Sequence, residues 1–310
     1  MTASSLGELP EIGPAVVTLG VFDGVHLGHR RVVQDTKRAA HERGAGSVAL
    51  VFSPHPDEVL RPATQVARLL PPEETLARLK GAGIDRALEI RFDDALRGME
   101  ADAFLAALAP AIDLRCITMS AGSAFGRARA GTPERVAQIG AERGFDVVVV
   151  EPLLAHGEPV SSSRIRRALA EGDMDLATLL LDGPPLLRGT VVTGDRRGRE
   201  LGFPTANLAF DYTPALPKLG IYLGYVTAEA PSVAPRHPAL VSVGVRPTFH
   251  DDGRVLVEAY LLDWEGDLYG ATLDLEVGTR LRAERRFDSV EALIEQMRAD
   301  EADARRRIGA

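Results

Sequence analysis

Residues 15–29 read AVVTLGVFDGVHLGH and run from a strand directly into a helix. The first six residues are apolar and partly β-branched, which is typical of a short buried strand. A helical pattern over residues 28–43 follows at once. We therefore expect a strand–loop–helix unit in which the loop lies at the end of the strand and the helix begins beside it.

The same alternation continues to about residue 151. Helical patterns cover 28–43, 72–82, 101–108 and 133–143, and strand patterns cover 15–20, 47–52, 86–90, 116–119 and 146–151. Near-continuous apolar strands that alternate with helices indicate a parallel sheet covered on both faces. In such sheets ligands bind beyond the carboxyl ends of the strands. The chemically unusual loops at those ends are therefore candidate binding elements.

The loop at residues 20–29 carries two histidines three positions apart, His26 and His29, with Gly28 between them. A helix N-terminus offers free amides and a positive dipole to a phosphate. Two imidazoles there could hydrogen-bond a triphosphate and stabilise the charge that develops during its transfer. The alternative is a pair of capping histidines. A metal site is less favoured, because no third ligand stands at a suitable spacing on the same helix.

Two further loops follow predicted strands. Residues 52–56 read FSPHP, in which two prolines make a rigid exit that could place an aromatic ring and an imidazole beside a planar ligand. Residues 160–167 read VSSSRIRR, in which serines can cap a helix and arginines occupy its first turn. The helix dipole opposes positive charge at that end, so an anion would explain the arginines. The alternatives are a plain strand-terminating loop and a capped surface helix.

The second half has a different pattern. Residues 182–185, DGPP, break a helical segment and form the predicted linker. Beyond it, short strands over 186–192, 220–227, 239–245, 255–262 and 271–277 follow one another without long helices, which indicates a small antiparallel barrel. One helix closes the chain, with Asp288 as the expected cap and Glu291 three residues later. Its apolar stripe is expected to pack on the barrel and comprises Val290, Leu293, Ile294 and Met297.

Residues 194–208 read GDRRGRELGFPTANL. The glycines permit positive φ or close backbone approach. In extended chain Thr205 and Asn207 fall on one face, and their oxygens suit Mg²⁺, which usually keeps phosphates in its shell. A surface hairpin with glycine turns is the simpler alternative. Farther along, Glu258 is a carboxylate on a largely apolar strand, where it would share a face with Tyr260 and Leu262.

These segments resemble known signatures. Residues 198–208 resemble the nucleotide-binding signature of flavokinases, and residues 20–29 resemble the Gly-x-Phe-Asp-x-x-His-x-Gly-His signature of nucleotidylyltransferases. The chain as a whole resembles the bacterial bifunctional riboflavin kinase/FAD synthetases. This resemblance implies an α/β, Rossmann-like nucleotidylyltransferase domain over 15–183, followed by a small antiparallel β-barrel kinase domain with a C-terminal helix over 186–310.

The resemblance also implies substrates and site residues. Riboflavin, FMN and ATP would be the substrates, with Mg²⁺ as cofactor. Glu258 would be the catalytic base of the kinase, with His26 and His29 catalytic in the first domain, and Thr205 and Asn207 would hold the metal. ATP and its phosphates would be bound by Gly20, Phe22, Asp23, Gly28, Ser161, Ser162, Ser163, Arg164, Gly194, Gly198, Gly202, Pro204, Thr205 and Asn207. Flavin would be bound by Pro54, His55, Pro56, Phe125, Arg282 and Glu284.

Three positions depart from the family pattern. Gly122 replaces an Asp or Asn, Ser123 replaces an aromatic residue, and Thr132 stands where an Asp is usual. The exchange at Gly122 removes a hydrogen-bond partner, and the exchange at Ser123 removes a large apolar contact surface. The alternative is therefore an active kinase whose first domain accepts another nucleotide or flavin analogue, or only binds nucleotide and regulates the kinase.

Composition limits the remaining classes. The 310 residues carry a formal net charge of −8, which disfavours a nucleic-acid partner because such proteins present a basic face. No apolar run reaches the length of a membrane span, so no membrane partner is expected. The single cysteine, Cys116, excludes an intrachain disulfide and is expected to be buried. We expect a cytoplasmic protein, and a homo-oligomer is left open.

Overall fold

The computed structural model describes residues 4–194, 201–230, 233–245 and 255–309. The chain divides into two compact units, one of Met1–Val66 with Pro72–Ser162 and one of Ala67–Pro71 with Ser163–Ala310. The predicted linker at 182–185 does separate a helix from a strand, since α8 (Met174–Leu181) ends just before it and β8 (Leu186–Val192) begins just after it. The unit boundary lies about twenty residues earlier. The predicted functional boundary at 183–186 stays a prediction.

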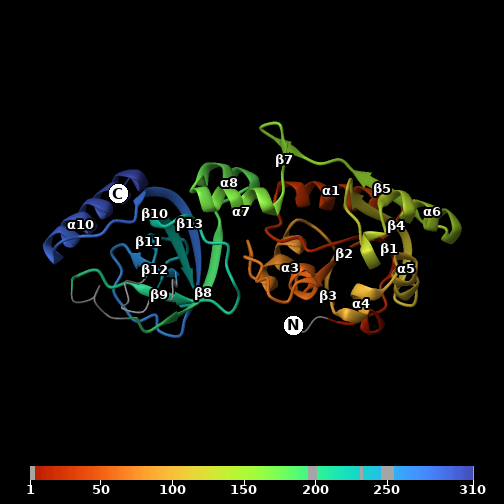
Figure 1. Cartoon of the computed structure of the whole chain (residues 1–310), viewed down its shortest axis with the longest axis horizontal. Helices are drawn as coiled ribbons and strands as arrows, with labels where there is room; N and C mark the ends of the chain where they lie inside the picture. Colours follow the sequence, from red (N-terminus) through yellow and green to blue (C-terminus); the bar gives the residue numbers. More distant parts are fainter. Residues whose placement is uncertain (1–3, 195–200, 231–232, 246–254, 310) are drawn as a thin grey trace. The chain divides into compact units, whose positions relative to one another are not determined.

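The first unit is built on a five-stranded parallel sheet in the order β3-β2-β1-β4-β5 (Figure 1). Its strands are β1 (Gly13–Gly20), β2 (Gly46–Ser53), β3 (Arg86–Arg91), β4 (Ile112–Ser120) and β5 (Asp146–Val150). The strand order reverses between β1 and β4, and such a reversal opens a crevice at the carboxyl ends of the strands. The predicted sheet is confirmed, and β4 begins four residues before the predicted strand.

Alternate residues of β1 face opposite sides of this sheet. Ala15 and Val17 join a core with Phe104, Val136 and other residues of two helices on one side. On the other side, Val16 joins Cys116 of β4 and Ala39 and Ala40 of the helix that follows β1. Both faces are therefore covered, as the continuous apolar strands predict. Cys116 is buried and free, as expected.

The main helices of the first unit match the predicted ranges closely. They are α1 (Leu27–Glu42), α3 (Pro72–Gly81), α5 (Ala101–Leu108) and α6 (Pro133–Arg143). The sequence did not predict the short helices α2 (Pro56–Leu60) and α4 (Asp94–Gly98), nor the two-residue strands β6 (Leu154–Ala155) and β7 (Glu158–Pro159). Two short 3₁₀ turns lie at Leu6–Glu8 and Arg127–Arg129. These pieces are too short to show a hydrophobic period.

The second unit is a closed antiparallel barrel in the order β10-β11-β12-β9-β8-β13 (Figure 1). Besides β8 its strands are β9 (Ala206–Ala209), β10 (Gly220–Ala228), β11 (His237–Val245), β12 (Val255–Leu261) and β13 (Thr272–Ala283). The four-residue β9 was not predicted as a strand, and β13 continues six residues beyond its prediction. Two helices, α7 (Ser162–Glu171) and α8, belong largely to this unit.

The barrel interior and exterior alternate along each strand. Tyr222, Val241 and Val243 are completely buried inside, whereas the residues between them face outward and are half-buried or packed against a helix. That helix is α10 (Val290–Ile308), whose Ala304 packs with Leu223 and Leu240 of the outer face. The barrel core is thus separate from the outer surface that α10 covers in part.

One prediction about α10 is wrong. Ser289, and not Asp288, is the N-cap, because its side chain accepts a hydrogen bond from the Ala292 N–H. In the predicted apolar stripe Val290 is 52% exposed, whereas Leu293, Ile294 and Met297 are half-buried. The buried contacts lie later, at Ala304 and at Asp300, which forms a bidentate ion pair with Arg282 of β13. An anchor made by a charge pair is invisible to a hydrophobic pattern.

Candidate active sites

The loop after β1 turns sharply before α1 begins. Phe22, Gly24 and Val25 all have positive φ, at +54°, +91° and +39°. His26 is the N-cap of α1, and its Nδ1 accepts a hydrogen bond from the His29 N–H at 3.3 Å. The capping alternative is therefore realised for His26, in a loop whose shape also directs the helix N-terminus to the sheet edge.

The two histidines form a stacked pair. Their ring centroids lie 3.6 Å apart with an interplanar angle of 15°, and the Phe22 ring meets His29 edge-on. Burial lowers the pKa of His29 well below its ordinary value, and the neighbouring His26 lowers this pKa further. Among the described residues, His29 Nδ1 is buried without a hydrogen-bond partner. His29 is therefore neutral at pH 7 and can contribute a hydrogen bond but not a positive charge.

The serine-rich loop packs against the histidine loop. The Ser162 hydroxyl donates to the Asp23 carbonyl at 2.9 Å. A Cβ placed on Gly28 would lie 3.1 Å from the Val160 carbonyl oxygen, so glycine allows the two backbones to approach. The structure thus brings together the predicted residues Gly28, Asp23 and Ser162. Ser163 and the buried Arg164 belong to the second unit, and their phosphate-binding role stays a prediction.

The loop after β2 is held by a local cap. His55 is the N-cap of α2, where its Nδ1 accepts a hydrogen bond from the backbone N–H of Asp57 at 3.1 Å. The backbone N–H of His55 donates to the Glu58 carboxylate at 3.2 Å. Pro54 follows a cis peptide bond and is exposed, and Pro56 is the first residue of the helix. These contacts explain a rigid strand exit. The flavin contact of this loop stays a prediction.

In the second unit, strand register assembles the candidate site. Asn207 of β9 lies directly opposite Glu258 of β12, and the Thr205 hydroxyl donates to Glu258 Oε1 at 3.5 Å. All three side chains are half-buried on the outer face of the barrel, since Ala206, Leu208 and the neighbours of Glu258 fill the interior. The Thr205 hydroxyl, just before β9, and the Asn207 amide of β9 therefore meet the Glu258 carboxylate of β12, which lies some fifty residues later in the sequence.

The glycine-rich segment supports this arrangement at one described position. A Cβ placed on Gly194 would lie 2.6 Å from Asn207 Cγ, so only glycine lets the Asn207 amide occupy its place. Gly202 has φ of +85°, and Pro204 is exposed beside Thr205. The predicted phosphate-binding residue Gly198 lies outside the described residues.

The register adds a third side chain to this row. Ser242 of β11 lies directly opposite Glu258, on the side away from Asn207. The strands themselves were predicted, but their pattern does not give the pairing register between them. Only the assembled barrel shows that Ser242, Glu258 and Asn207 form one row.

Comparison with known proteins places each half of the chain in a family. The FAD synthetase family model matches residues 9–164, and the riboflavin kinase model matches residues 181–308. A bifunctional riboflavin kinase/FMN adenylyltransferase of Listeria monocytogenes is 34% identical over 94% of this chain and 91% of its own length. The Pseudomonas fluorescens protein of the same description is 36% identical over 96% and 94%. The chain belongs to this family.

A solved structure extends the likeness to the fold of almost the whole chain. A Streptococcus pneumoniae protein described as a macrolide-efflux protein has a TM-score of 0.87 and 30% identity, covering 97% of each chain. In the part of the chain that the structure describes, no helix is long and apolar enough to cross a membrane. The described residues also contain no cluster of three or more His, Cys, Asp or Glu side chains arranged for a metal ion.

Two of the family departures, Gly122 and Ser123, follow the end of β4, and the third, Thr132, precedes α6. Gly122 has φ of +78° with open space around it, and the Ser123 hydroxyl donates to the Ser120 carbonyl at 2.7 Å. Thr132 is the N-cap of α6, since its hydroxyl accepts from the Arg135 N–H at 3.4 Å. Asp and Thr both serve as N-caps. The exchange at Thr132 therefore retains the structural role that an Asp would fill.

The remaining predicted flavin-binding residues have structural partners. Phe125 is 7% exposed and packs against Phe104 in the core of the first unit. Arg282 is engaged with Asp300, and Glu284 accepts from the Val245 N–H at 3.3 Å. Their contact with flavin stays a prediction, to be tested separately from these structural roles.

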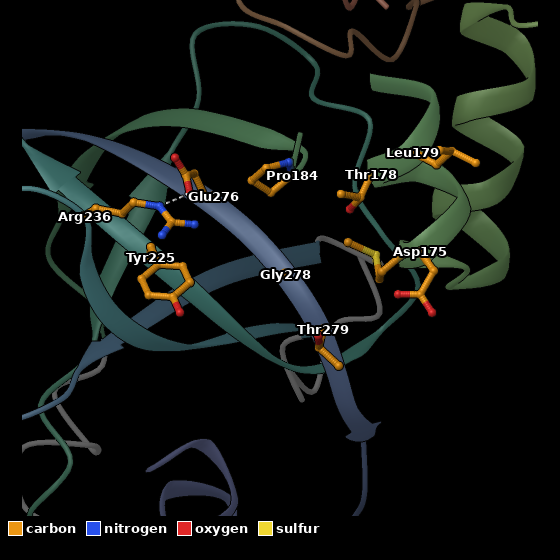
Figure 2. Close-up of a pocket in the computed structure, with 10 residues that line it drawn as sticks. Asp175, Thr178, Leu179, Pro184, Tyr225, Arg236, Glu276, Gly278 and Thr279 are labelled. Carbon is orange, nitrogen blue, oxygen red and sulfur yellow. Dashed lines mark hydrogen bonds and ion pairs between the residues drawn. The ribbon is translucent and has the colours of Figure 1, made fainter. Parts of the chain in front are cut away.

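Figure 2 shows a pocket of about 450 Å³ in the second unit, which none of the predicted site residues lines. It lies between α8 and the outer face of β10 and β13, with Thr178 and Leu179 on one side and Tyr225 on the other. The Arg236 guanidinium lies 4.1 Å from the Tyr225 ring centroid and pairs with Glu276 at 2.9 Å. These side chains satisfy one another, and the pocket is separate from the row of Asn207 and Glu258.

Proposed function

We propose that the second unit phosphorylates riboflavin to FMN and that the first unit adenylylates FMN to FAD, with ATP as co-substrate in both steps. Both family matches support these two activities. The observation that carries the kinase assignment is that Thr205 and Asn207, at and just before β9, meet Glu258 of the neighbouring strand β12. The FAD synthetase match favours adenylylation over the alternative of a retuned or non-catalytic first domain.

In the kinase step, Glu258 accepts the proton of the ribityl 5′-hydroxyl. The hydroxyl oxygen then forms a bond to the γ-phosphorus of ATP, and the bond to the bridging oxygen breaks as ADP leaves. Phosphoryl transfer depends mainly on positioning and on neutralising charge. A half-buried carboxylate that one hydroxyl already contacts is suited to hold its orientation while it takes a proton.

The donor set beside Glu258 fits Mg²⁺. The Thr205 hydroxyl and the Asn207 carbonyl oxygen are hard ligands of the kind that magnesium takes together with substrate phosphates. The close approach of Asn207 to Gly194 leaves this amide a defined place that a Cβ would fill. Bound Mg²⁺ would neutralise charge on the phosphate oxygens. Thr205 can offer a lone pair to the ion and still donate its proton to Glu258.

In the adenylylation step, a phosphate oxygen of FMN attacks the α-phosphorus of ATP and pyrophosphate leaves. The substrate supplies the nucleophile, so no covalent enzyme residue is needed. Neutral His29 and its stacked partner His26 stabilise the phosphates by hydrogen bonds. The Ser162 hydroxyl donates to the Asp23 carbonyl and so holds the serine loop against the histidine loop.

A single experiment tests both assignments, since each half-reaction is the internal control for the other. Purified chain with Mg²⁺ and ATP is given riboflavin or FMN, and the flavins are separated over time. Glu258→Gln should lower FMN formation by about 10²- to 10⁴-fold, the range for a general base, and leave the conversion of FMN to FAD unchanged. His29→Ala should do the reverse. Wild-type kinase activity in Glu258→Gln would contradict the base assignment, and FMN that accumulates without FAD would support the alternative for the first domain.

We further infer that the enzyme works in the cytoplasm on small molecules, which its single cysteine and net acidity support. A homo-oligomer stays a prediction, and light scattering on the purified chain measures it directly.

A further inference from the structure

A buried carboxylate of α10 organises the segment in which β13 ends. Asp300 is 6% exposed and accepts from Nε and Nη2 of Arg282, the second-last residue of β13, at 2.7–2.9 Å. The side-chain amide of Gln296 donates to the same carboxylate at 2.9 Å. The Gln296 carbonyl oxygen in turn accepts from Arg285 Nη1 at 3.2 Å. Asp300 therefore reaches two arginines of one short segment, Arg282 directly and Arg285 through Gln296.

Glu284 stands between these two arginines in the sequence and lies beside the candidate kinase site. Its Oε1 accepts from the Val245 N–H at 3.3 Å. A Cβ placed on Gly244 would lie 2.6 Å from Glu284 Oε1 and 3.8 Å from Ser242 Oγ. Ser242 is the register partner of Glu258. The exposed Glu284 carboxylate is therefore held over β11, next to the row that contains the candidate base.

Stability alone does not account for a buried charge at Asp300. A buried ion pair often adds no net stability over apolar residues of the same volume. What the bidentate contact adds is direction, since a planar guanidinium meets a carboxylate in one geometry. We infer that Asp300 is a positioning residue of the riboflavin-binding site. Through Arg282 and Gln296 it holds residues 282–285, and with them Glu284, at the edge of the kinase site.

This role rests on the proposed kinase reaction and on the predicted contact of Glu284 with flavin. A segment that is ordered before its ligand arrives loses less conformational freedom on binding, so the ligand binds more tightly. Asn207 and Glu258 belong to β9 and β12, whereas Asp300 acts on the end of β13. Loss of the anchor should therefore weaken riboflavin binding and spare the transfer step. In kinetic terms KM for riboflavin rises while kcat stays nearly constant.

The test compares Asp300→Asn with Asp303→Asn in the full chain. Asp300→Asn keeps the shape of the side chain and removes the charge that Arg282 contacts. It should raise KM for riboflavin about tenfold, the size expected when a hydrogen bond between charged groups is lost, with kcat and KM for ATP within about twofold. Asp303 is the matched control, since it lies on the same helix and pairs with Arg306 and Arg307 of that helix. Asp303→Asn should change none of the three constants.

A milder pair of variants separates positioning from the stability of the helix. Gln296→Ala releases Arg285 but leaves the ion pair between Arg282 and Asp300 in place, and Arg285→Ala breaks the same contact from the other side. Each should raise KM for riboflavin about threefold. The double variant should raise it no further, because both residues act through one hydrogen bond. Hydrogen exchange of α10 should be the same in Gln296→Ala as in the wild type.

The outcomes are distinct. An unchanged KM for riboflavin in Asp300→Asn and Gln296→Ala would overturn the positioning role. An equal fall in kinase kcat and in FAD formation from FMN would also overturn it, because that pattern reports general loss of folded protein. If Asp300→Asn does not fold, Gln296→Ala decides the question, since it retains the buried pair. A wild-type chain that does not phosphorylate riboflavin would overturn the proposed kinase itself.

Discussion

The two candidate sites are held together in opposite ways. In the first unit, the hydrogen bonds that fix the candidate histidines span very short stretches of chain, three residues between His26 and His29 and two between His55 and Asp57. In the second unit, the bond between Thr205 and Glu258 spans 53 residues and depends on the pairing of two strands. The first site is built from preformed loops, and the second is built by register.

The difference has consequences for how each site tolerates change. A capped loop keeps its local shape as long as its helix forms, because the cap satisfies backbone donors that the helix leaves free. A row across a barrel keeps its geometry only while neighbouring backbones approach at the right distance. Sites of the second kind should therefore be sensitive to small steric changes at positions that touch no substrate.

The largest effect expected from this comparison follows from the close approach of Gly194 to Asn207 in the second unit. Gly194→Ala should lower kinase kcat about 100-fold, because the new Cβ would displace the Asn207 amide and a misplacement of about 1 Å costs that much. Quantifying FMN formed from riboflavin checks the rate, and FAD formed from FMN should stay unchanged. Gly98→Ala is the matched control, since an added Cβ there meets nothing within 4 Å. Full kinase activity in Gly194→Ala would mean that Asn207 is not held by this approach.

The next effect concerns the pH dependence of the histidine loop. Since the pKa of His29 is lowered in the folded state, the unfolded chain binds more protons below about pH 6.5. The first unit should therefore lose stability as pH falls below that value, by at most about 1.4 kcal/mol per pH unit from this group. His29→Gln should remove that part of the slope. Hydrogen exchange of the peptides of β1 and α1, followed from pH 7 to pH 5, measures it.

The single tryptophan provides the control for this experiment. Trp264 lies in the second unit, so its fluorescence reports unfolding of that unit separately. Its pH dependence should be the same in the wild type and in His29→Gln. A slope in the first unit that survives the substitution would show that other groups, and not His29, titrate on unfolding.

A smaller effect tests the hydrogen bond between Ser162 and Asp23, which ties two distant loops of the first site together. Ser162→Ala removes a hydrogen bond that spans 139 residues. A bond of this kind contributes about 1 kcal/mol, so the conversion of FMN to FAD should slow about fivefold. The kinase reaction of the same preparation should be unaffected. If both reactions slow equally, the bond serves general folding and not the loop arrangement.

Local patterns in the sequence predicted most of the architecture and failed where structure depends on pairing. The parallel sheet, its covering helices and most barrel strands follow from hydrophobic period and turn residues. The four-residue β9 is too short to show a period, and its place between β8 and β12 is set by tertiary pairing. For the same reason the histidine motifs could be recognised as motifs, whereas the pairing of Asn207 with Glu258 could not. The cap of α10 shifted from Asp288 to Ser289 because both residues can cap, and packing decides between them.

The smallest expected effect bears on whether the departures from the family matter. Thr132 caps α6 much as an Asp would, and Asp and Thr differ by only a few tenths of a kcal/mol in this role. Thr132→Asp should therefore change the free energy of unfolding of the first unit by less than about 0.5 kcal/mol, whereas Thr132→Ala should cost about 1 kcal/mol. Both are measured by hydrogen exchange in α6. The rate of FAD formation should stay within about twofold in Thr132→Asp, because a cap orients only its own helix. A rise of several-fold would show that a carboxylate at this position takes part in adenylylation, and the first site would then depend on more than its capped loops.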